Sequence, residues 1–257
     1  MMGAKKIVFD FGMHTAQDTR RYLAEGFHVV AIEANPELVA AAQKSMAEYI
    51  ANKQLTILNL GVAGENGVLS FYKNLHLSEW SSFDFEIGSR DNTPFEEVKV
   101  ECVTADKIFR QFDKAYYVKI DIEGFDHFVL SSLDPDNLPQ YISCEDSSTQ
   151  NLDILYEKGY RKFKLINQAR NFEAFSLSKE QNTILNYIQF KYNRLKMRLQ
   201  KVFPFKYPYS SSGPFGEATA GPWHDYATVK GYYQSFYKGE ERIPINHLSW
   251  FDIHASL

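Results

Sequence analysis

The stretch YYVKIDIEGFD, residues Tyr116 to Asp126, decides the fold of this chain. Its first part, Tyr116 to Ile122, is dominated by β-branched and aromatic residues, which predicts a buried strand. Asp121 and Glu123 stand two positions apart, so a strand conformation would place both carboxylates on one face. Lys119 would lie behind them on the same face.

Charged groups at the end of a central strand are costly in a core, and this points to a function. In an open α/β sheet, ligands bind at the carboxyl ends of the strands. A purely structural alternative is that the two carboxylates favour the amino end of the next helix, which we predict from Phe125 to Leu133. The rest of the chain has to distinguish these interpretations.

The composition is that of a globular protein with a sizeable core. With 257 residues, 44% of them hydrophobic, the chain can form one large domain or one domain with an added segment. The net charge of -4 gives no reason to expect nucleic acid or an anionic membrane as a partner. Cys102 and Cys144 lie in apolar, strand-like runs, so we expect buried free thiols rather than a disulfide or a metal site.

The chain shows no sign of export or membrane insertion. Its start, MMGAKKIVFDFG, leaves no room for a signal peptide before the first strand. No apolar run approaches the roughly 20 residues that a membrane span requires. We therefore predict a cytoplasmic protein without a membrane span.

Strands and helices alternate over the first 60 residues. Asn35 is a favourable helix cap and Pro36 suits the first helical position. The alternation predicts a βαβαβ unit with a parallel sheet and right-handed crossovers. The predicted elements are a strand at Lys6 to Phe11, a helix at Ala16 to Glu25, a strand at Phe27 to Ile32, a helix from Pro36 to about Ile50 and a strand at Gln54 to Leu60.

The segment from Gly61 to Thr104 departs from this alternation. Its pattern predicts strands at Val68 to Tyr72 and Glu97 to Thr104, with a polar loop at Ser78 to Pro94 between them. We interpret the two strands as an extra antiparallel piece at the edge of the main sheet. Regular elements then return, with a helix at Asp106 to Phe112, a strand at Tyr141 to Cys144, a helix at Gln150 to Lys158 and a strand at Arg161 to Ile166.

The first unit carries the signature of a nucleoside cofactor. Asp10 precedes a glycine turn at Gly12, and Glu33 ends the second strand, some 20 positions later, where an acid can bind ribose hydroxyls. Dinucleotide folds need GxGxxG to approach a pyrophosphate, and only one of these glycines is present. An acid just before the turn would repel phosphates but suits the ammonium group of a methionine moiety. These features favour S-adenosylmethionine over NAD, which remains the alternative.

A metal site is a weaker hypothesis. Asp121, Glu123 and Glu145 could together hold a divalent ion if their side chains converged. No second metal-ligand type stands at a useful spacing from His14, which we expect to point to solvent or to the cofactor tail. We therefore predict no metal.

At the level of motifs the chain resembles the FkbM-type methyltransferase family. The most distinctive match is VKIDIEGFD, residues Val118 to Asp126. The supporting matches, in the order of the family, are FDFGMHTAQDT at Phe9 to Thr19, VVAIEANP at Val29 to Pro36, Ser81-Ser82, and VTADKIF at Val103 to Phe109. Two later phrases, SSGPFGE at Ser211 to Glu217 and WFDIHA at Trp250 to Ala255, look similar to a subgroup of the family.

The resemblance implies a class I methyltransferase, Rossmann-like α/β fold, with a mostly parallel seven-stranded sheet and an antiparallel last strand. Its activity would be methyl transfer from S-adenosylmethionine, usually to a hydroxyl oxygen of a sugar, glycan or secondary metabolite. One departure from the family is Ala16, which stands where members often have a second glycine in the first loop.

The predicted site follows from the resemblance and from the strand ends. Asp121 or Glu123 would accept the hydroxyl proton, with Lys119 keeping a carboxylate ionised. The residues expected around the cofactor are Asp10, Gly12, Met13, His14, Thr15, Thr19, Glu33, Ala34, Asn35, Gly61, Ser81, Ser82 and Asp121. The residues expected at the acceptor, a small molecule or a glycan, are Glu145, Trp223 and Trp250.

The last ninety residues are expected to be an insertion followed by a closing strand. A helix is predicted from Ser178 to about Val202, a loop over Phe203 to Trp223, and the antiparallel last strand at Ser249 to Ala255. The predicted division is a core at 1–169, an insertion at 170–247 and the closing strand within 248–257. The insertion would be a lid over the acceptor or an arm of a homodimer. A catalytically silent binding or assembly protein of the same fold is the alternative function.

Overall fold

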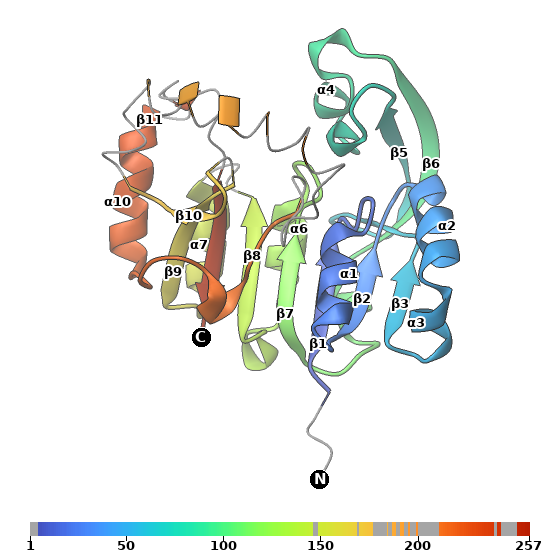
Figure 1. The fold of residues 1–257 in the computed structure, drawn as a ribbon, viewed down its shortest axis with the longest axis horizontal. Coiled ribbons are helices and arrows are strands. Elements are labelled where there is room, and N and C mark those ends of the chain that lie inside the picture. Colours follow the sequence, from blue (N-terminus) through green and yellow to red (C-terminus); the bar gives the residue numbers. More distant parts are fainter. Residues whose placement is uncertain are drawn as a thin grey trace. The chain divides into compact units, whose positions relative to one another are not determined.

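The computed structural model describes residues 5–145, 149–168, 170–176, 211–238, 241–242 and 251–257, with single helical positions at 184, 187, 188, 191, 192, 195 and 199. The chain divides into two compact units, Met1–Gln140 and Tyr141–Leu257. The fold is α/β, with a mostly parallel central sheet and an antiparallel strand, as the sequence predicts (Figure 1).

The first unit is built on a parallel sheet in the order β7-β1-β2-β3. Its strands are β1 (Ile7–Phe11), β2 (His28–Ile32), β3 (Leu55–Leu58) and β7 (Ala115–Ile120). All five residues of β1 are buried, because this strand has a neighbour on each side and apolar side chains on both faces. Parallel pairing brings the carboxyl ends of β7, β1 and β2 to one edge, where the predicted site residues follow.

The helices of the first unit follow the predicted alternation. They are α1 (Gln17–Ala24), α2 (Pro36–Ser45), α3 (Ala47–Ala51), α5 (Ala105–Phe109) and α6 (Asp126–Ser131), with a short η3 turn (Pro135–Asn137). The predicted cap is confirmed, since the Asn35 side chain accepts a hydrogen bond from the backbone N–H of Glu37. The helix predicted to reach about Ile50 is interrupted at Met46, whose ψ of 24° separates α2 from α3.

The two strands predicted in this segment pair antiparallel, but the prediction that they lie at the edge of the main sheet is wrong. The strands β4 (Gly61–Val62), β5 (Gly67–Asn74) and β6 (Phe95–Val103) form a separate three-stranded sheet in the order β4-β6-β5. β6 pairs antiparallel with β5 but parallel with β4. The long β5–β6 pairing, eight residues from Gly67 to Asn74, satisfies the backbone of this sheet without the main one.

The segment between β5 and β6 is more regular than the predicted polar loop. It contains η1 (Ser78–Trp80), α4 (Phe85–Gly88) and η2 (Arg90–Asn92). Asp84 caps α4 by accepting from the backbone N–H of Glu86. Phe85 packs edge-on against Tyr72 of β5 and Phe95 of β6, so tertiary contacts rather than a local pattern hold this helix. We call the sheet of β4, β5 and β6 the insertion sheet, and residues 75–94, between β5 and β6, its connecting segment.

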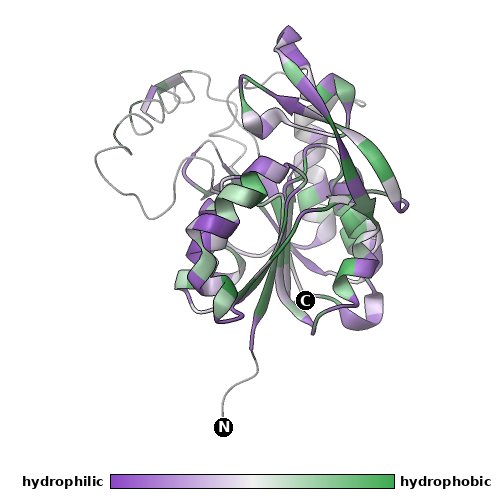
Figure 2. Cartoon of the chain, turned by 90° about the vertical axis from the view of Figure 1, so that its right-hand side faces the viewer, coloured by the Kyte–Doolittle hydropathy of each residue, from purple (hydrophilic) through white to green (hydrophobic). Residues whose placement is uncertain are grey.

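Figure 2 shows how hydropathy follows these elements. The strands of the sheet are mostly hydrophobic, whereas the helices mix hydrophilic and hydrophobic residues along their length. This is the pattern expected when helices cover a parallel sheet and face solvent on their outer side.

The second unit has its own run of strands, in the order β10-β9-β13-β8. They are β8 (Tyr141–Glu145), β9 (Lys162–Asn167), β10 (Glu173–Ala174) and β13 (Phe251–Ser256). β13 lies between β8 and β9 and is antiparallel to both, which confirms the predicted closing strand. Among the described residues of this unit, the two-residue β10 is a strand that the sequence did not predict.

The second unit also contains α7 (Thr149–Lys158), η4 (Gly216–Ala218), α10 (Tyr226–Phe236), β11 (Tyr237–Lys238) and β12 (Glu241–Arg242). The sequence did not predict α10. This helix packs on α7, where the Tyr226 ring stacks 4.1 Å from the Tyr156 ring and its hydroxyl donates to Asp153. Most of the predicted helix from Ser178 to Val202 lies outside the described residues.

Within the part of the chain that the structure describes, no helix has both the length and the apolar character to cross a bilayer. Cys102 and Cys144 are both buried, as predicted, and neither forms a disulfide.

Candidate functional site

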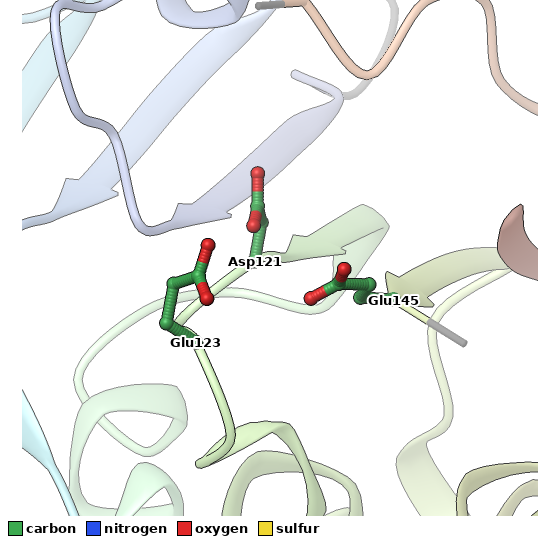
Figure 3. Close-up of side chains that lie close together, drawn as sticks. All are labelled: Asp121, Glu123 and Glu145. Carbon is green, nitrogen blue, oxygen red and sulfur yellow. The ribbon is translucent and has the colours of Figure 1, made fainter. Parts of the chain in front are cut away.

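The turn after β7 carries the two predicted catalytic carboxylates. β7 ends at Ile120, so the prediction that Asp121 and Glu123 share one face of a strand is wrong. They come together because the chain turns: Glu123 has a φ of 46° and Gly124 a φ of 93°. One carboxylate oxygen of Asp121 lies within 4.8 Å of one of Glu123, and Figure 3 shows both side chains rising from this turn.

Lys119 is the charged centre beneath this turn. Its side chain is buried, and its Nζ lies 3.3 Å from Asp10 Oδ1 and 3.4 Å from Asp121 Oδ2. It also donates a hydrogen bond to the carbonyl of Gly12 at 2.8 Å. Burial favours the neutral amine, but the charges of Asp10 and Asp121 outweigh it, so the pKa of Lys119 is raised. The ammonium therefore stays charged and ties β1 to the turn after β7.

Asp10 is enclosed by the protein's own groups. Its carboxylate is fully buried, with Thr19 Oγ1 donating to Oδ2 at 2.5 Å and Lys119 facing Oδ1. Burial raises the pKa of Asp10, and the Lys119 charge opposes that rise. In this arrangement Asp10 and Thr19, both predicted at the cofactor, fix the base of the glycine turn.

The glycine turn is pressed against the turn after β7. Gly12 has a φ of 82°, and a Cβ built on it would lie 1.8 Å from the carbonyl oxygen of Asp121. The N–H groups of Gly12 and Met13 both donate to the carbonyl of Ile32, so neither points toward a ligand. Ala16 is buried and left-handed, with a φ of 64°. Only a glycine fits at Gly12, whereas Ala16 carries the strain of a left-handed non-glycine residue.

Glu33 joins the glycine turn to the start of α2. Its side chain is only 8% exposed, which rules out an exposed strand-end acid. Oε2 accepts from the N–H of His14 and Oε1 from the N–H of Asn35, both at 2.8 Å. Burial raises the pKa of Glu33, while these two N–H donors lower it. Asn59, which the sequence analysis missed, donates to the carbonyl of Glu33.

The other predicted residues of the glycine turn and of the loop after β2 differ in exposure. Met13 is buried, Thr15 is exposed, and Ala34 is half-buried. The ring of His14 hydrogen-bonds Ser78 Oγ of η1 at 2.7 Å. Burial lowers the pKa of His14, so a neutral ring fits this contact. His14 thus connects the glycine turn to the insertion sheet's connecting segment.

Gly61, Ser81 and Ser82 lie in the insertion sheet and its connecting segment. A Cβ on Gly61 would come within 2.3 Å of the Phe83 ring, so this glycine allows close packing. The hydroxyl of Ser81 accepts from the N–H of Asn74. The hydroxyl of Ser82 is buried and donates to the carbonyl of Glu123 at 2.8 Å. Ser82 therefore supports the turn after β7.

Arg90 is a site residue that sequence reasoning missed. Its Nη2 lies 2.6 Å from Glu123 Oε2, and its guanidinium lies over the Trp80 ring, 5.0 Å from the centroid. Burial and the nearby charge of Asp121 raise the pKa of Glu123 to about 7, against the opposing effect of Arg90. No local pattern marks Arg90, because its partner is 33 positions away in the chain.

The predicted acceptor residues belong to the second unit. Glu145 ends β8 and is half-buried. Trp223 donates through its indole N–H to Glu217 and stacks on Tyr141, the first residue of β8, with 6.4 Å between the ring centroids. Four residues of strand, about 13 Å, separate that end of β8 from Glu145. Trp250 lies outside the described residues.

A divalent ion bound by Asp121, Glu123 and Glu145 would need ligands from both units, so the metal site stays an untested alternative.

The first unit fits a cofactor without phosphates. An anionic diphosphate would meet the carboxylates of Glu33 and Asp121, and the backbone N–H groups of Gly12 and Met13 could not bind it because they donate to the carbonyl of Ile32. A nucleoside with a cationic, zwitterionic tail instead meets carboxylates that can accept from hydroxyl and ammonium groups. The side chain of Asp121 is 44% exposed, which leaves it accessible at this edge.

The chain is distantly similar to solved structures of two methyltransferases. One is precorrin-6y C5,15-methyltransferase from Geobacter metallireducens, with a TM-score of 0.41 and 9% identity, covering 98% of this chain and 80% of that one. Another is phosphoethanolamine N-methyltransferase 2 from Haemonchus contortus in complex with S-adenosyl-L-methionine, with a TM-score of 0.40 and 10% identity. This chain is fully covered in that match and spans 49% of the Haemonchus contortus chain. No curated protein matches the sequence.

The family model described as the methyltransferase FkbM domain matches residues 3–162, which is more than half of the chain. The match spans the glycine turn, the acid after β2, the insertion sheet and the turn after β7. S-adenosylmethionine, rather than NAD, is therefore the cofactor that the residues of the first unit would hold. The chain belongs to the FkbM methyltransferase domain family.

Proposed function

We propose that the protein methylates a hydroxyl oxygen of a sugar, a glycan or a secondary metabolite. The observation that carries this proposal is the pair of carboxylates after β7, one of them with a pKa raised to about 7. A hydroxyl acceptor must lose a proton as its oxygen is methylated, and a carboxylate within reach can take it. An acceptor that is already a free nucleophile would not need such a base.

The residues around the carboxylates of Asp121 and Glu123 would have separate roles in the reaction. Bound S-adenosylmethionine supplies an electrophilic methyl group on a sulfonium. Lys119 pairs with Asp121, with 3.4 Å between Nζ and Oδ2. Glu123 and Asp121 stand where an acceptor hydroxyl could be held and deprotonated, and alignment of that oxygen would supply much of the rate. The acceptor hydroxyl would give its proton to a carboxylate as its oxygen took the methyl group, and the electron pair of the broken carbon–sulfur bond would stay on sulfur.

The cofactor side of the proposal rests on the loops after β1 and β2. The carboxylate of Glu33 accepts two backbone N–H groups and retains lone pairs that can accept from ribose hydroxyls. Asn35 and His14 are held beside it by these same hydrogen bonds. We expect the glycine turn, with Met13 and Thr15, to line the tail of the cofactor, and Asp121 to face the acceptor.

A protein that binds the cofactor without turnover is the second candidate. Ala16 favours it, because a left-handed alanine replaces the glycine common at this position and stiffens the first loop. Calorimetric titration with S-adenosylmethionine and with S-adenosylhomocysteine separates this candidate from a protein that binds neither.

The first prediction tests the reaction. Methyl-labelled S-adenosylmethionine is incubated with the protein and a panel of sugars, glycans and hydroxyl-bearing metabolites. Asp121→Asn keeps the shape of the side chain but removes its charge, so we expect near-normal cofactor binding and a turnover lower by about 10²–10⁴-fold. Unchanged turnover would show that Asp121 only shapes the site. Label on nitrogen or sulfur, with none on oxygen, would contradict the proposed acceptor.

A further inference from the structure

We propose that Arg90 is a positioning residue that holds the Glu123 carboxylate in its ionised, proton-accepting state, an inference that rests on the proposed function. Arg90 comes from η2, in the connecting segment of the insertion sheet, and Glu123 from the turn after β7. The insertion would thus supply part of the reaction centre rather than only extend the fold.

The geometry fixes Arg90 at three points. Its Nη2 lies 2.6 Å from Glu123 Oε2, which is within the range of a charge-assisted hydrogen bond. Its Nε donates to the carbonyl of Ile87 at 3.1 Å, and its guanidinium lies over the Trp80 ring. Arginine suits this place because its planar group can stack and donate in several directions at once. The side chain is held by its own segment and offers one end to Glu123.

The same segment also holds the backbone of Glu123. Ser82 donates to the Glu123 carbonyl at 2.8 Å. Glu123 has a φ of 46°, a left-handed conformation that a non-glycine residue adopts at some cost. Ser82 therefore holds the backbone of Glu123, and Arg90 holds its side chain. These two contacts counteract the strain of the turn.

The charges around Glu123 explain why such a partner matters. Asp121, in the same turn, and Asp126, at the start of α6, both disfavour a second negative charge. Lys119 pairs with Asp121 and Asp10, not with Glu123. Among the described residues of the first unit, Arg90 forms the ion pair that opposes this repulsion. Without Arg90, Glu123 would hold its proton at neutral pH and could not accept one from a hydroxyl.

The experiment follows the titration of Glu123 directly and needs no acceptor. Glutamate labelled with ¹³C at its carboxyl carbon reports the midpoint, and Glu123→Gln assigns the signal. We expect a midpoint near pH 7 in the unaltered protein and a rise of about one pH unit or more, a tenfold change in the ionisation constant, in Arg90→Gln. Arg90→Lys should restore part of the difference. Arg110→Gln is the matched control, because Arg110 is 80% exposed and pairs with Asp106 instead.

An unchanged midpoint in a folded Arg90→Gln protein would overturn the proposal. If this variant fails to fold, the Nε–H resonance of Arg90 in the unaltered protein decides, assigned by its loss in Arg90→Lys. That resonance should shift with the same midpoint as Glu123, and a flat response would again overturn the role of Arg90. The proposed function fails separately, by the absence of methyl transfer to oxygen, whatever the titration shows.

Discussion

At the scale of single residues, Gly12 is the position where the glycine turn after β1 touches the turn after β7. Its left-handed φ and the carbonyl of Asp121 are two separate reasons why no side chain fits there. The sequence indicates a glycine turn, but it does not indicate that the turn packs on a loop more than a hundred positions away. Lys119 reinforces the same contact through the Gly12 carbonyl.

We predict that Gly12→Ala destabilises the protein by about 2 kcal/mol more than Gly26→Ala. Gly26 is the matched control, because its φ is 89° and a Cβ there would meet nothing within 4 Å. In the control, the free energy of unfolding should fall only by the strain of a left-handed alanine, about 1–2 kcal/mol. Gly12→Ala adds overpacking, about 1–3 kcal/mol. Urea denaturation measures both losses, and equal losses would show that the turn yields to the methyl group.

The turn also explains why the prediction from strand periodicity is right that Asp121 and Glu123 lie close together but wrong about the reason. The alternation of side chains predicts which residues lie near each other on a strand. Here the strand ends at Ile120, three residues before Glu123, and a left-handed turn brings the carboxylates together instead. The end of a strand depends on where its partners stop, which the sequence of the strand does not contain.

At the scale of elements, β13 carries a buried histidine that the proposed reaction does not use. His254 is 1% exposed and is paired in register with Ser143 of β8 and Lys164 of β9. Among the described residues, neither of its ring nitrogens has a hydrogen-bond partner. Burial, helped by the charge of Lys164, lowers the pKa of His254 from 6.5 to about 3. The folded protein therefore holds a neutral ring.

This buried ring predicts a loss of stability at acid pH. The unfolded chain protonates His254 below about pH 6.5, while the folded protein does so only near pH 3, so the free energy of unfolding falls as the pH drops through that window. The slope from this one residue is about 1.4 kcal/mol per pH unit. His254→Gln should remove that slope between pH 6.5 and 5, measured by urea denaturation, while the exposed His76→Gln should keep it. Equal slopes in all three proteins would contradict a neutral His254.

At the scale of the whole molecule, the chain contains two compact units, and the residues proposed for the cofactor lie in the first. The second unit includes the closing strand β13 and the helix α10. The sequence of α10, YATVKGYYQSF, contains a glycine and many aromatic or β-branched residues, which are poor helix formers. Val229 and Tyr233 are fully buried, so packing within the unit outweighs the weak propensity.

We expect α10 to be an integral part of the second unit. Tyr233→Ala should lower the free energy of unfolding by about 3–5 kcal/mol, because it removes a fully buried aromatic ring. Gln234→Ala, at the exposed neighbouring position, should change it by less than about 0.5 kcal/mol. Thermal and urea unfolding measure both, and a small effect of Tyr233→Ala would indicate that α10 detaches without loss. A lid formed by residues 170–247 stays a prediction.

The sequence by itself determined the alternation of strands and helices, the acids at the ends of β1, β2 and β7, the cofactor and the family. These features follow from local periodicity, from caps and from short motifs, all of which lie within a few residues of each other. Only the tertiary structure decided which groups meet: His14 with Ser78, 64 positions apart, Arg90 with Glu123, 33 apart, and Lys119 with the Gly12 carbonyl, 107 apart. Such pairs depend on the conformations of turns and on the ends of strands, which long-range packing sets and no local pattern encodes.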